Sequence, residues 1–187
     1  MFQPGPILVN GKKCSSSKAS QLVSIFSPSF QYGLNVFEGI RFYKNSKHIY
    51  PFLYKEHIER LLESCKLIGF EKYPSYEEVE SDILMLIKTK VIDIDVYIKY
   101  IVGYLGEGSW YARHKPDRIC FYYKSNSILR LENPTFKKAK FTSIKRISHN
   151  NFPPKIKCGA NYINSRFGFL EINNSSVNNE KFLPIFF

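Results

Sequence analysis

Apolar residues recur at intervals of three and four positions between Lys55 and Phe70, and charged residues fill the positions between them. This spacing places the apolar side chains on one face of a helix and the charged side chains on the others. The sequence therefore predicts an amphipathic helix at residues 55–70. Its apolar series consists of Ile58, Leu61, Leu62, Cys65 and Ile68.

A second helix is predicted from Ser75 onward. Ser75 and Glu78 have the spacing of a capping box, in which each side chain binds the backbone N–H of the other residue. Such a pair marks the start of a helix when apolar residues follow it. Here the apolar residues that follow are Val79, Ile83, Leu84 and Ile87.

Three segments have the composition of β-strands. Residues 6–12 form a short apolar run that ends in Asn10-Gly11, a pair that suits a type I′ hairpin turn. Residues 95–104 and 118–123 are rich in β-branched and aromatic side chains. This part of the chain therefore combines two helices with several strands.

A change of pattern divides the chain into two parts. Residues 124–136 are polar, contain a proline and show no sustained period, so they are predicted to form a linker. We expect a small N-terminal domain at residues 1–123 and the beginning of a larger domain at residues 137–187. In the latter, alternation at residues 140–147 predicts a strand, and Asn161 is a candidate N-cap for a helix that carries apolar side chains. These side chains are Ile163, Phe167 and Leu170.

Composition argues against several classes of partner. The net charge of +11 would suit nucleic acid, but the lysines are spread along the chain, which favours a solvated basic surface. The four cysteines include no C-x-x-C pair, so neither a zinc site nor a redox motif is indicated. No run approaches ~18 apolar residues, and the first residues lack a signal-peptide pattern. We therefore expect a soluble, cytoplasmic protein with no nucleic-acid or membrane partner.

Three motifs carry the functional information. Residues 36–41 read Val-Phe-Glu-Gly-Ile-Arg, and residues 55–61 read Lys-Glu-His-Ile-Glu-Arg-Leu. The third motif, at residues 146–162, contains Lys157 followed by an Asn-Tyr pair. In this order and spacing they resemble the fold-type IV (class IV) pyridoxal-phosphate aminotransferases, most closely the branched-chain amino acid aminotransferases. The resemblance extends at a lower grade from about residue 7 to about residue 187.

The first motif concerns the substrate. On the residues alone, two glycines bracket an aromatic turn, so that Tyr32 and Phe37 could line a pocket or pack in a core. The resemblance implies that both line an apolar pocket and that four further residues contact the substrate. Lys99 stands where the family often has an arginine, and an ammonium meets a carboxylate as a point charge rather than as a fork. The four residues are Gly39, Arg41, Tyr97 and Lys99.

The other two motifs imply residues that bind the cofactor. Arg60 would bind the phosphate, because a guanidinium makes paired hydrogen bonds to it. Lys157, rather than Lys155, would be the Schiff-base lysine, since only Lys157 stands in register with the Asn161-Tyr162 pair. Tyr162 would hydrogen-bond the 3-oxygen of the cofactor ring. Taken alone, Arg60 and Lys157 would be ordinary surface cations.

The resemblance implies an α+β fold, pyridoxal 5′-phosphate as cofactor, and a homodimer. It further implies transfer of the amino group between a branched-chain L-amino acid (Leu, Ile or Val) and 2-oxoglutarate, with no metal. The family's acidic residue that pairs with the pyridine nitrogen would follow Phe187, so we expect a truncated form.

Two alternatives stay open at this point. The chain could be a catalytically inactive remnant that acts only as a dimerising or interaction protein. It could also be another class IV enzyme, such as a D-amino acid aminotransferase or an aminodeoxychorismate lyase. The branched-chain form of the motif at residues 36–41 argues against this second alternative.

Overall fold

The structure is a computed structural model. The chain forms two compact units. The first unit contains Met1–Ile128 together with Ile156–Cys158, and the second contains Leu129–Lys155 and Gly159–Phe187. Helices and strands both contribute, which confirms the α+β prediction. The predicted linker at 124–136 lies almost wholly outside the described residues, so the predicted domain boundary stays a prediction. The described residues are 4–46, 48–88, 94–124, 137–174 and 181–187.

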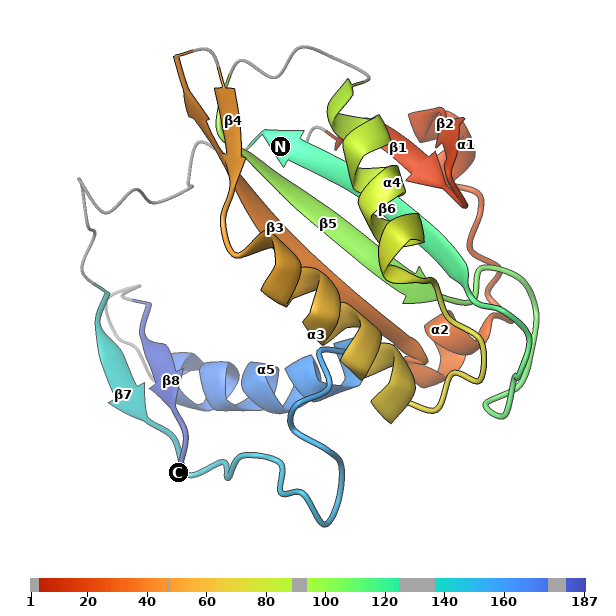
Figure 1. Ribbon diagram of the computed structural model, residues 1–187. Helices are drawn as coiled ribbons and strands as arrows, with labels where there is room; N and C mark the ends of the chain where they lie inside the picture. The colour runs from red at the N-terminus through yellow and green to blue at the C-terminus, as the bar shows by residue number, and fades with distance from the viewer. Residues whose placement is uncertain (1–3, 47, 89–93, 125–136, 175–180) are drawn as a thin grey trace. The chain divides into compact units, whose positions relative to one another are not determined.

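A six-stranded antiparallel sheet forms the centre of the first unit, as Figure 1 shows. The strand order is β2-β1-β6-β5-β3-β4, and the strands predicted at residues 6–12, 95–104 and 118–123 are confirmed. The six strands are β1 (Pro4–Val9), β2 (Lys12–Cys14), β3 (Asn35–Asn45), β4 (His48–Pro51), β5 (Val96–Gly103) and β6 (Asp117–Lys124).

The turn between β1 and β2 has the predicted residues in the predicted conformation. Asn10 has φ 49° and Gly11 has φ 75°, as a type I′ turn requires at both central positions. The Asn10 side chain also joins the turn to β6, since it donates to Asp117 and accepts from the backbone N–H of Arg118, each at 2.8 Å. The hairpin is therefore fixed to the sheet by side-chain as well as backbone hydrogen bonds.

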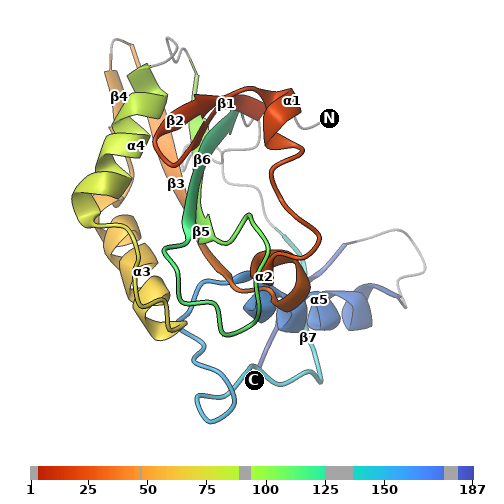
Figure 2. The same ribbon diagram turned by 90° about the vertical axis from the view of Figure 1, so that its right-hand side faces the viewer.

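Two long helices, α3 (Tyr54–Leu67) and α4 (Tyr76–Lys88), cover one face of the sheet, and Figure 2 shows this layer from the side. Both predicted helices are confirmed. The capping box of α4 is also confirmed, because Ser75 N donates to the Glu78 carboxylate at 2.9 Å and Glu78 N donates to Ser75 Oγ at 3.2 Å. One side chain differs, since Leu84 is 45% exposed. The buried stripe runs instead through Val79, Ile83 and Leu86.

The segment at residues 31–41 is not the aromatic turn that the sequence predicted. A short helix, α2 (Pro28–Tyr32), ends at Gly33, whose φ of 66° supplies the only turn. From Asn35 onward the chain is strand β3, which pairs with β5 over eight consecutive residues. This continuous pairing outweighs the weak local preference of Gly39 for a turn. A further short helix, α1, spans Ser16–Ala19.

Side chains of β3 and β5 alternate between the two faces of the sheet. Over residues 36–42 and 96–102, even-numbered residues are buried on the face that α3 and α4 cover. Over the same stretches, odd-numbered residues point to the opposite face, which we call the open face, and are half-buried or exposed. The buried set in these two strands is Val36, Glu38, Ile40, Phe42, Val96, Ile98, Tyr100 and Val102.

The second unit contains β7 (Ala139–Phe141), α5 (Gly159–Asn174) and β8 (Leu183–Ile185), and its two strands pair in parallel. The strand predicted at 140–147 is wrong beyond residue 141, because the N–H and hydroxyl of Ser143 donate to the Glu171 carboxylate on α5 and the N–H of Ile144 donates to Oγ1 of Thr142.

The predicted start of α5 is also wrong. The helix begins at Gly159, so Asn161 lies inside the first turn, where its side-chain amide donates to the carbonyl of Pro153 at 3.5 Å. Two side chains predicted for its apolar face, Ile163 and Phe167, are more than half exposed within this chain.

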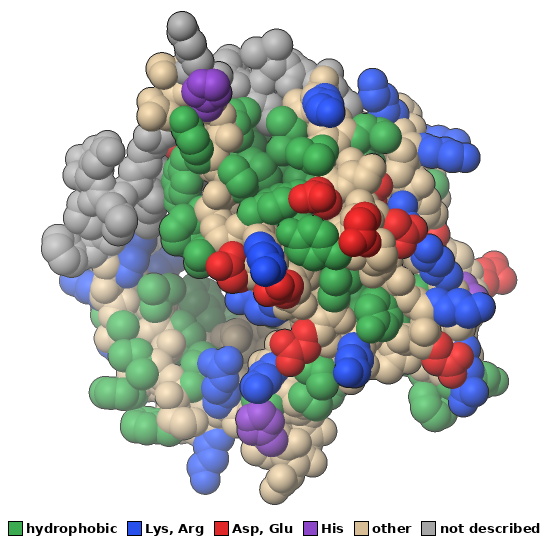
Figure 3. Space-filling model, in the orientation of Figure 1, with side chains coloured by type: hydrophobic (Ala, Val, Ile, Leu, Met, Phe, Trp, Pro, Cys, Tyr) green, Lys and Arg blue, Asp and Glu red, His purple; other side chains and the backbone are tan. Residues whose placement is uncertain are grey.

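Charges of both signs cover the outer side of α3 and α4. Figure 3 shows Asp and Glu side chains interspersed with Lys and Arg over these helices. On this face the positive net charge is therefore not gathered into a basic patch. Among the described residues, no helix combines the length and the apolar character that crossing a membrane requires.

Candidate functional site

A buried carboxylate lies between β3 and α3. Glu38 is fully buried, and its side chain is held by Arg60, whose Nε donates to Oε1 at 2.5 Å and whose Nη2 donates to Oε2 at 2.8 Å. Burial by itself raises the pKa of Glu38, but the hydrogen bonds from His57 and Arg60 and their charges outweigh it and leave the pKa below its usual value. The carboxylate is therefore ionised and fully paired.

His57 completes this cluster. Its Nδ1 lies 2.9 Å from Oε2 of Glu38, and the backbone N–H of Gly39 donates to the same oxygen at 3.2 Å. A carboxylate only accepts, so the Nδ1 atom of His57 carries the proton in this contact. His57 and Arg60 are three residues apart on α3, so both side chains reach Glu38 from one helix face.

The backbone of Lys157 is fixed to the same two elements. Its N–H donates to Oγ of Ser64 at 3.2 Å, and its carbonyl accepts from the N–H of Phe37 at 2.9 Å. Ser64 is buried and follows Arg60 by one helical turn on α3. Cys158 forms an isolated β-bridge with Val36 at the edge of β3. Lys157 is thus anchored to α3 beside Arg60 and to β3 beside Glu38.

The side chain of Lys157 lies over the ring of Phe37, with 5.3 Å from Nζ to the ring centroid. The Nζ atom of Lys99 lies 4.3 Å from the centroid of the same ring. Both distances suit attraction between an ammonium and an aromatic ring. Lys155 is exposed, whereas Lys157 is half-buried. The ring of Phe37 therefore brings together two amines that lie 58 positions apart in the sequence.

Most residues predicted to contact the substrate share the open face of the sheet. In the register of β3 and β5, Gly39 pairs with Lys99 and Arg41 pairs with Tyr97, and Phe37 precedes them on the same face. The structure therefore brings these five residues together on one face of two adjacent strands. Two predicted residues lie elsewhere. They are Tyr32, half exposed at the end of α2, and Tyr162, half exposed on α5 in the second unit.

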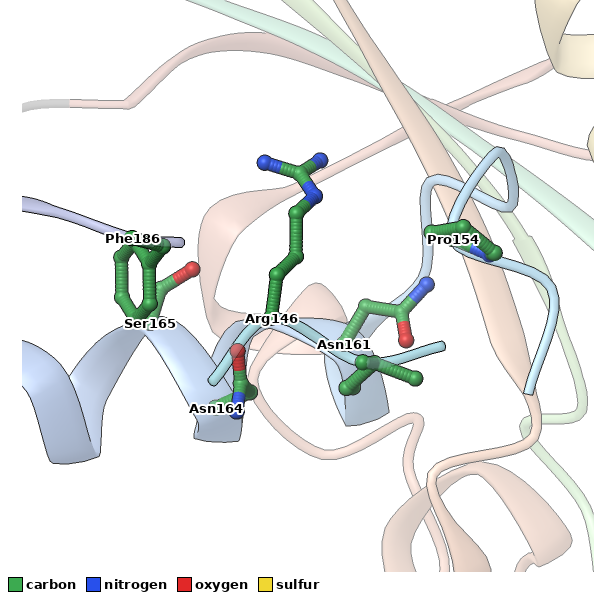
Figure 4. Close-up of a pocket in the computed structure, with 7 residues that line it drawn as sticks. Arg146, Pro154, Asn161, Asn164, Ser165 and Phe186 are labelled. Carbon is green, nitrogen blue, oxygen red and sulfur yellow. The ribbon is translucent and has the colours of Figure 1, made fainter. Parts of the chain in front are cut away.

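The second unit has a small pocket of its own, shown in Figure 4. Arg146 rises from the segment before α5, and the first turns of the helix present Asn161, Asn164 and Ser165. Its volume of about 40 Å³ corresponds to a few water molecules. Its lining consists of Arg146, Ile147, Pro154, Asn161, Asn164, Ser165 and Phe186.

Sequence reasoning missed three residues of the site: Glu38, His57 and Ser64. Glu38 and His57 belong to the quoted motifs but received no role. One signal was available, since Glu38 is in phase with the apolar residues Val36 and Ile40, and a carboxylate on a buried strand face needs a charged partner. Ser64 has no comparable signal, because its partner is 93 positions away.

A family model described as "Amino-transferase class IV" matches residues 35–167. The chain is 31% identical over 147 residues to the "Probable branched-chain-amino-acid aminotransferase" of Aquifex aeolicus (strain VF5), covering 76% of this chain and 47% of that protein. The branched-chain-amino-acid aminotransferase of Escherichia coli (strain K12) is 30% identical over the same length, with the same coverage. The chain spans about half the length of these relatives.

Solved structures show the same likeness. The branched-chain amino acid aminotransferase from Thermobaculum terrenum in its PLP form has a TM-score of 0.78 and 26% identity, covering 98% of this chain and 58% of that one. The branched-chain aminotransferase from Thermoproteus uzoniensis with norvaline has a TM-score of 0.78 and 25% identity, covering 90% and 56%.

Proposed function

We propose that this chain, which belongs to the class IV aminotransferases, acts as a pyridoxal 5′-phosphate-dependent transaminase of branched-chain L-amino acids, with 2-oxoglutarate as the acceptor. One observation carries the proposal. The backbone of Lys157 is bound to Ser64, one turn after Arg60 on α3, while its amine lies over the ring of Phe37. An amine and a guanidinium are thereby supported by one helix and one strand.

The residues of the first unit fit this cofactor by the chemistry of their donors. Lys157 would supply the amine that holds the aldehyde carbon of pyridoxal 5′-phosphate, and the planar fork of Arg60 would hold the phosphate. Arg60 reaches solvent, since 48% of its side chain is exposed. When bound, the cofactor supplies an electron sink that stabilises negative charge at the substrate Cα. We assign Tyr162 as the donor to the ring oxygen on the basis of the Asn-Tyr motif alone.

Arg60 and Lys157 then have separate roles. Arg60 would bind and orient the phosphate, and Lys157 would hold the cofactor through its amine. Once a substrate amine takes its place, Nζ of Lys157 would accept the proton from the substrate Cα, and with the second substrate it would return a proton to that carbon. These two roles require Nζ of Lys157 to stay close to the reacting carbon, which the two backbone hydrogen bonds of this residue favour.

The open face suits a substrate with an apolar side chain and a carboxylate. Phe37 and Tyr97 present aromatic surface, and Gly39 leaves room for the ring of Tyr97 to lie against β3. Lys99 and Arg41 add two cations on this face, and we assign Lys99 to the substrate carboxylate as a point charge. An apolar pocket of this kind discriminates by ~1–3 kcal/mol per methylene, which suits Leu, Ile and Val. We also assign the exposed ring of Tyr32 to this pocket.

The matched lysines Lys157 and Lys155 test the proposal. Lys157→Ala should abolish the visible absorbance that forms with pyridoxal 5′-phosphate and should abolish leucine-dependent consumption of 2-oxoglutarate. Lys155→Ala, two positions away and exposed, should retain both. If only Lys155→Ala lost the absorbance and the activity, the assignment of Lys157 by its register with the Asn161-Tyr162 pair would be wrong. Absence of Lys157-dependent absorbance in the wild-type chain would instead favour a non-catalytic interaction protein.

We further propose that the chain forms a homodimer and works in the cytoplasm. Several large apolar side chains of the first unit are more than half exposed, which is typical of an association surface. The four cysteines are free, as a reducing compartment would keep them. Light scattering across a concentration series should show the dimer, and a monomer throughout would contradict it. The exposed side chains include Phe26, Phe30, Trp110 and Tyr111.

As to domain organisation, we propose that residues 1–123 form the small domain of the family fold and that residues 137–187 belong to its larger, cofactor-binding domain. Limited proteolysis offers a direct check, because cleavage of a linker at 124–136 should release a stable N-terminal fragment. Cleavage concentrated inside residues 1–123 would contradict this division.

A further inference from the structure

We infer that Glu38 is a positioning residue for phosphate recognition: it holds the guanidinium of Arg60 in one orientation, and this orientation sets how tightly the phosphate group of the cofactor binds. The inference rests on the proposed function, in which Arg60 binds that phosphate.

The geometry of the contact is that of a two-point clamp. Nε and Nη2 of Arg60 donate to the two oxygens of one carboxylate, at 2.5 and 2.8 Å. A guanidinium is planar, so two parallel hydrogen bonds along one edge fix both its plane and its rotation within that plane. The direction of the adjacent edge, formed by Nη1 and Nη2, is then fixed as well. Glu38 thereby determines where the outer edge of Arg60 points.

Glu38 can serve as a fixed reference because it is buried and hydrogen-bonded on several sides. Its side chain is fully buried, and Oε2 also accepts from Nδ1 of His57 and from the N–H of Gly39. Arg60, by contrast, is about half exposed and has a long side chain with many rotamers. Contact with an immobile carboxylate removes most of this freedom before any ligand arrives. The loss of side-chain entropy on phosphate binding is therefore smaller.

Charge alone predicts the opposite role for Glu38. The carboxylate neutralises the guanidinium, and a neutral pair attracts a phosphate less strongly than a lone Arg60 would. If net charge governed the site, removal of the negative charge from Glu38 would strengthen phosphate binding. If orientation governs it, the same change weakens binding. The sign of the effect therefore separates the two explanations.

The experiment compares pyridoxal 5′-phosphate with pyridoxal, which has the same ring and aldehyde but no phosphate. Dissociation constants are measured on the full chain by visible absorbance and by fluorescence of the single tryptophan. Glu38→Gln should weaken binding of pyridoxal 5′-phosphate by about tenfold, the size of one hydrogen bond to a charged group, and leave that of pyridoxal unchanged. Arg60→Lys should also lose the preference for the phosphate, and the double variant should bind no more weakly than Arg60→Lys alone.

A second variant keeps the test independent of charge and of folding. Glu38→Asp retains the negative charge but is one methylene shorter, so it cannot reach both nitrogens of Arg60. It should show the same selective loss as Glu38→Gln. Thermal unfolding of each variant identifies any that fails to fold, and the other one then decides.

Three results would overturn the inference while the proposed function stands. Equal or tighter binding of pyridoxal 5′-phosphate by both Glu38 variants would show that charge governs the site. Equal losses for pyridoxal and its phosphate would reduce Glu38 to a structural role. A phosphate preference that Arg60→Lys removes and both Glu38 variants keep would reject the inference and leave the proposed function intact. Wild-type chain without Lys157-dependent absorbance would instead reject the proposed function, and the inference with it.

Discussion

The hydroxyl of Tyr97 lies directly against the backbone of Gly39, so a Cβ at Gly39 would be 1.5 Å from the Tyr97 oxygen. In the strand register, Tyr97 pairs with Arg41 and Gly39 pairs with Lys99, so the ring of Tyr97 leans diagonally across β3. Gly39 is therefore needed for lack of a side chain rather than for a special backbone angle. The ring of Tyr97 thereby occupies the open face at the centre of β3.

We expect Gly39→Ala to destabilise the chain by about 1–3 kcal/mol, the usual cost of overpacking. The ring carbon Cζ of Tyr97 would also lie only 2.1 Å from the new Cβ, so the whole ring must move. Denaturant unfolding measures the effect. Tyr97→Val in the same chain should recover most of the loss, whereas Tyr97→Phe should not, because it keeps Cζ. Equal stability of wild type and Gly39→Ala would contradict this packing.

A buried ionic network joins α4 to strands β5 and β6. Asp82 is buried and accepts from the Tyr100 hydroxyl at 2.6 Å and from Nε of Arg118 at 3.0 Å. We expect Arg118→Met to cost about 3–5 kcal/mol, because it leaves a buried carboxylate without its counter-charge. Tyr100→Phe should cost less, about 1–3 kcal/mol, since Asp82 keeps Arg118.

An exposed pair supplies the matched control for this network. Arg113 and Glu71 form an ion pair at 3.4 Å with side chains that are 79% and 54% exposed. Arg113→Met should therefore change the free energy of unfolding by about 1 kcal/mol or less. Urea unfolding compares the two variants. If Arg113→Met and Arg118→Met lower the free energy of unfolding equally, burial does not determine how much these ion pairs stabilise the fold.

The capping box of α4 predicts a graded response at Ser75. Replacement by alanine removes the acceptor for Glu78 N, a bond of 3.2 Å, and should cost about 0.5–2 kcal/mol. Replacement by glycine should cost only a few tenths of a kcal/mol, because glycine lets water reach the exposed N–H group. Thermal unfolding of the two variants checks the order. Ser75→Gly less stable than Ser75→Ala would contradict it.

Glu78 should make stability depend on pH in the acidic range. The N–H of Ser75, then Lys115 and Arg118, lower the pKa of Glu78 to about 2. Since the folded-state pKa lies below the unfolded value of about 4.3, the carboxylate stabilises the fold fully above that value. This stability is lost as pH falls toward 2. Because Glu78 is 36% exposed, solvent screening reduces its size.

The measurement compares the unfolding free energy of wild type and Glu78→Gln between pH 2 and pH 7. Their difference should be largest at pH 7, shrink below pH 4.3 and nearly vanish at pH 2. Glu107→Gln, at an exposed position, serves as the control and should follow the wild-type curve. A difference between wild type and Glu78→Gln that is constant with pH would show that Glu78 acts through packing alone.

The sequence by itself determined the elements whose causes are local. The apolar period predicts α3, the Ser75 and Glu78 pair predicts the start of α4, and Asn10-Gly11 predicts the first hairpin. In each case the interacting residues are within a few positions of one another, so the pattern is visible in a short window. The motifs also predicted the class IV family, which the match over residues 35–167 confirms.

Only the tertiary structure decided how the site is built. Nothing local shows that Glu38 clamps Arg60, 22 positions away, or that Ser64 holds the backbone of Lys157, 93 positions away. The same holds for β3, which forms because β5 pairs with it although Gly39 suggests a turn. Likewise, the contacts of Ser143 with the Glu171 carboxylate end a strand that alternation alone would continue. The physical reason is common to all four, since hydrogen bonds and burial between distant segments outweigh local preferences of a few tenths of a kcal/mol to about 1 kcal/mol per residue.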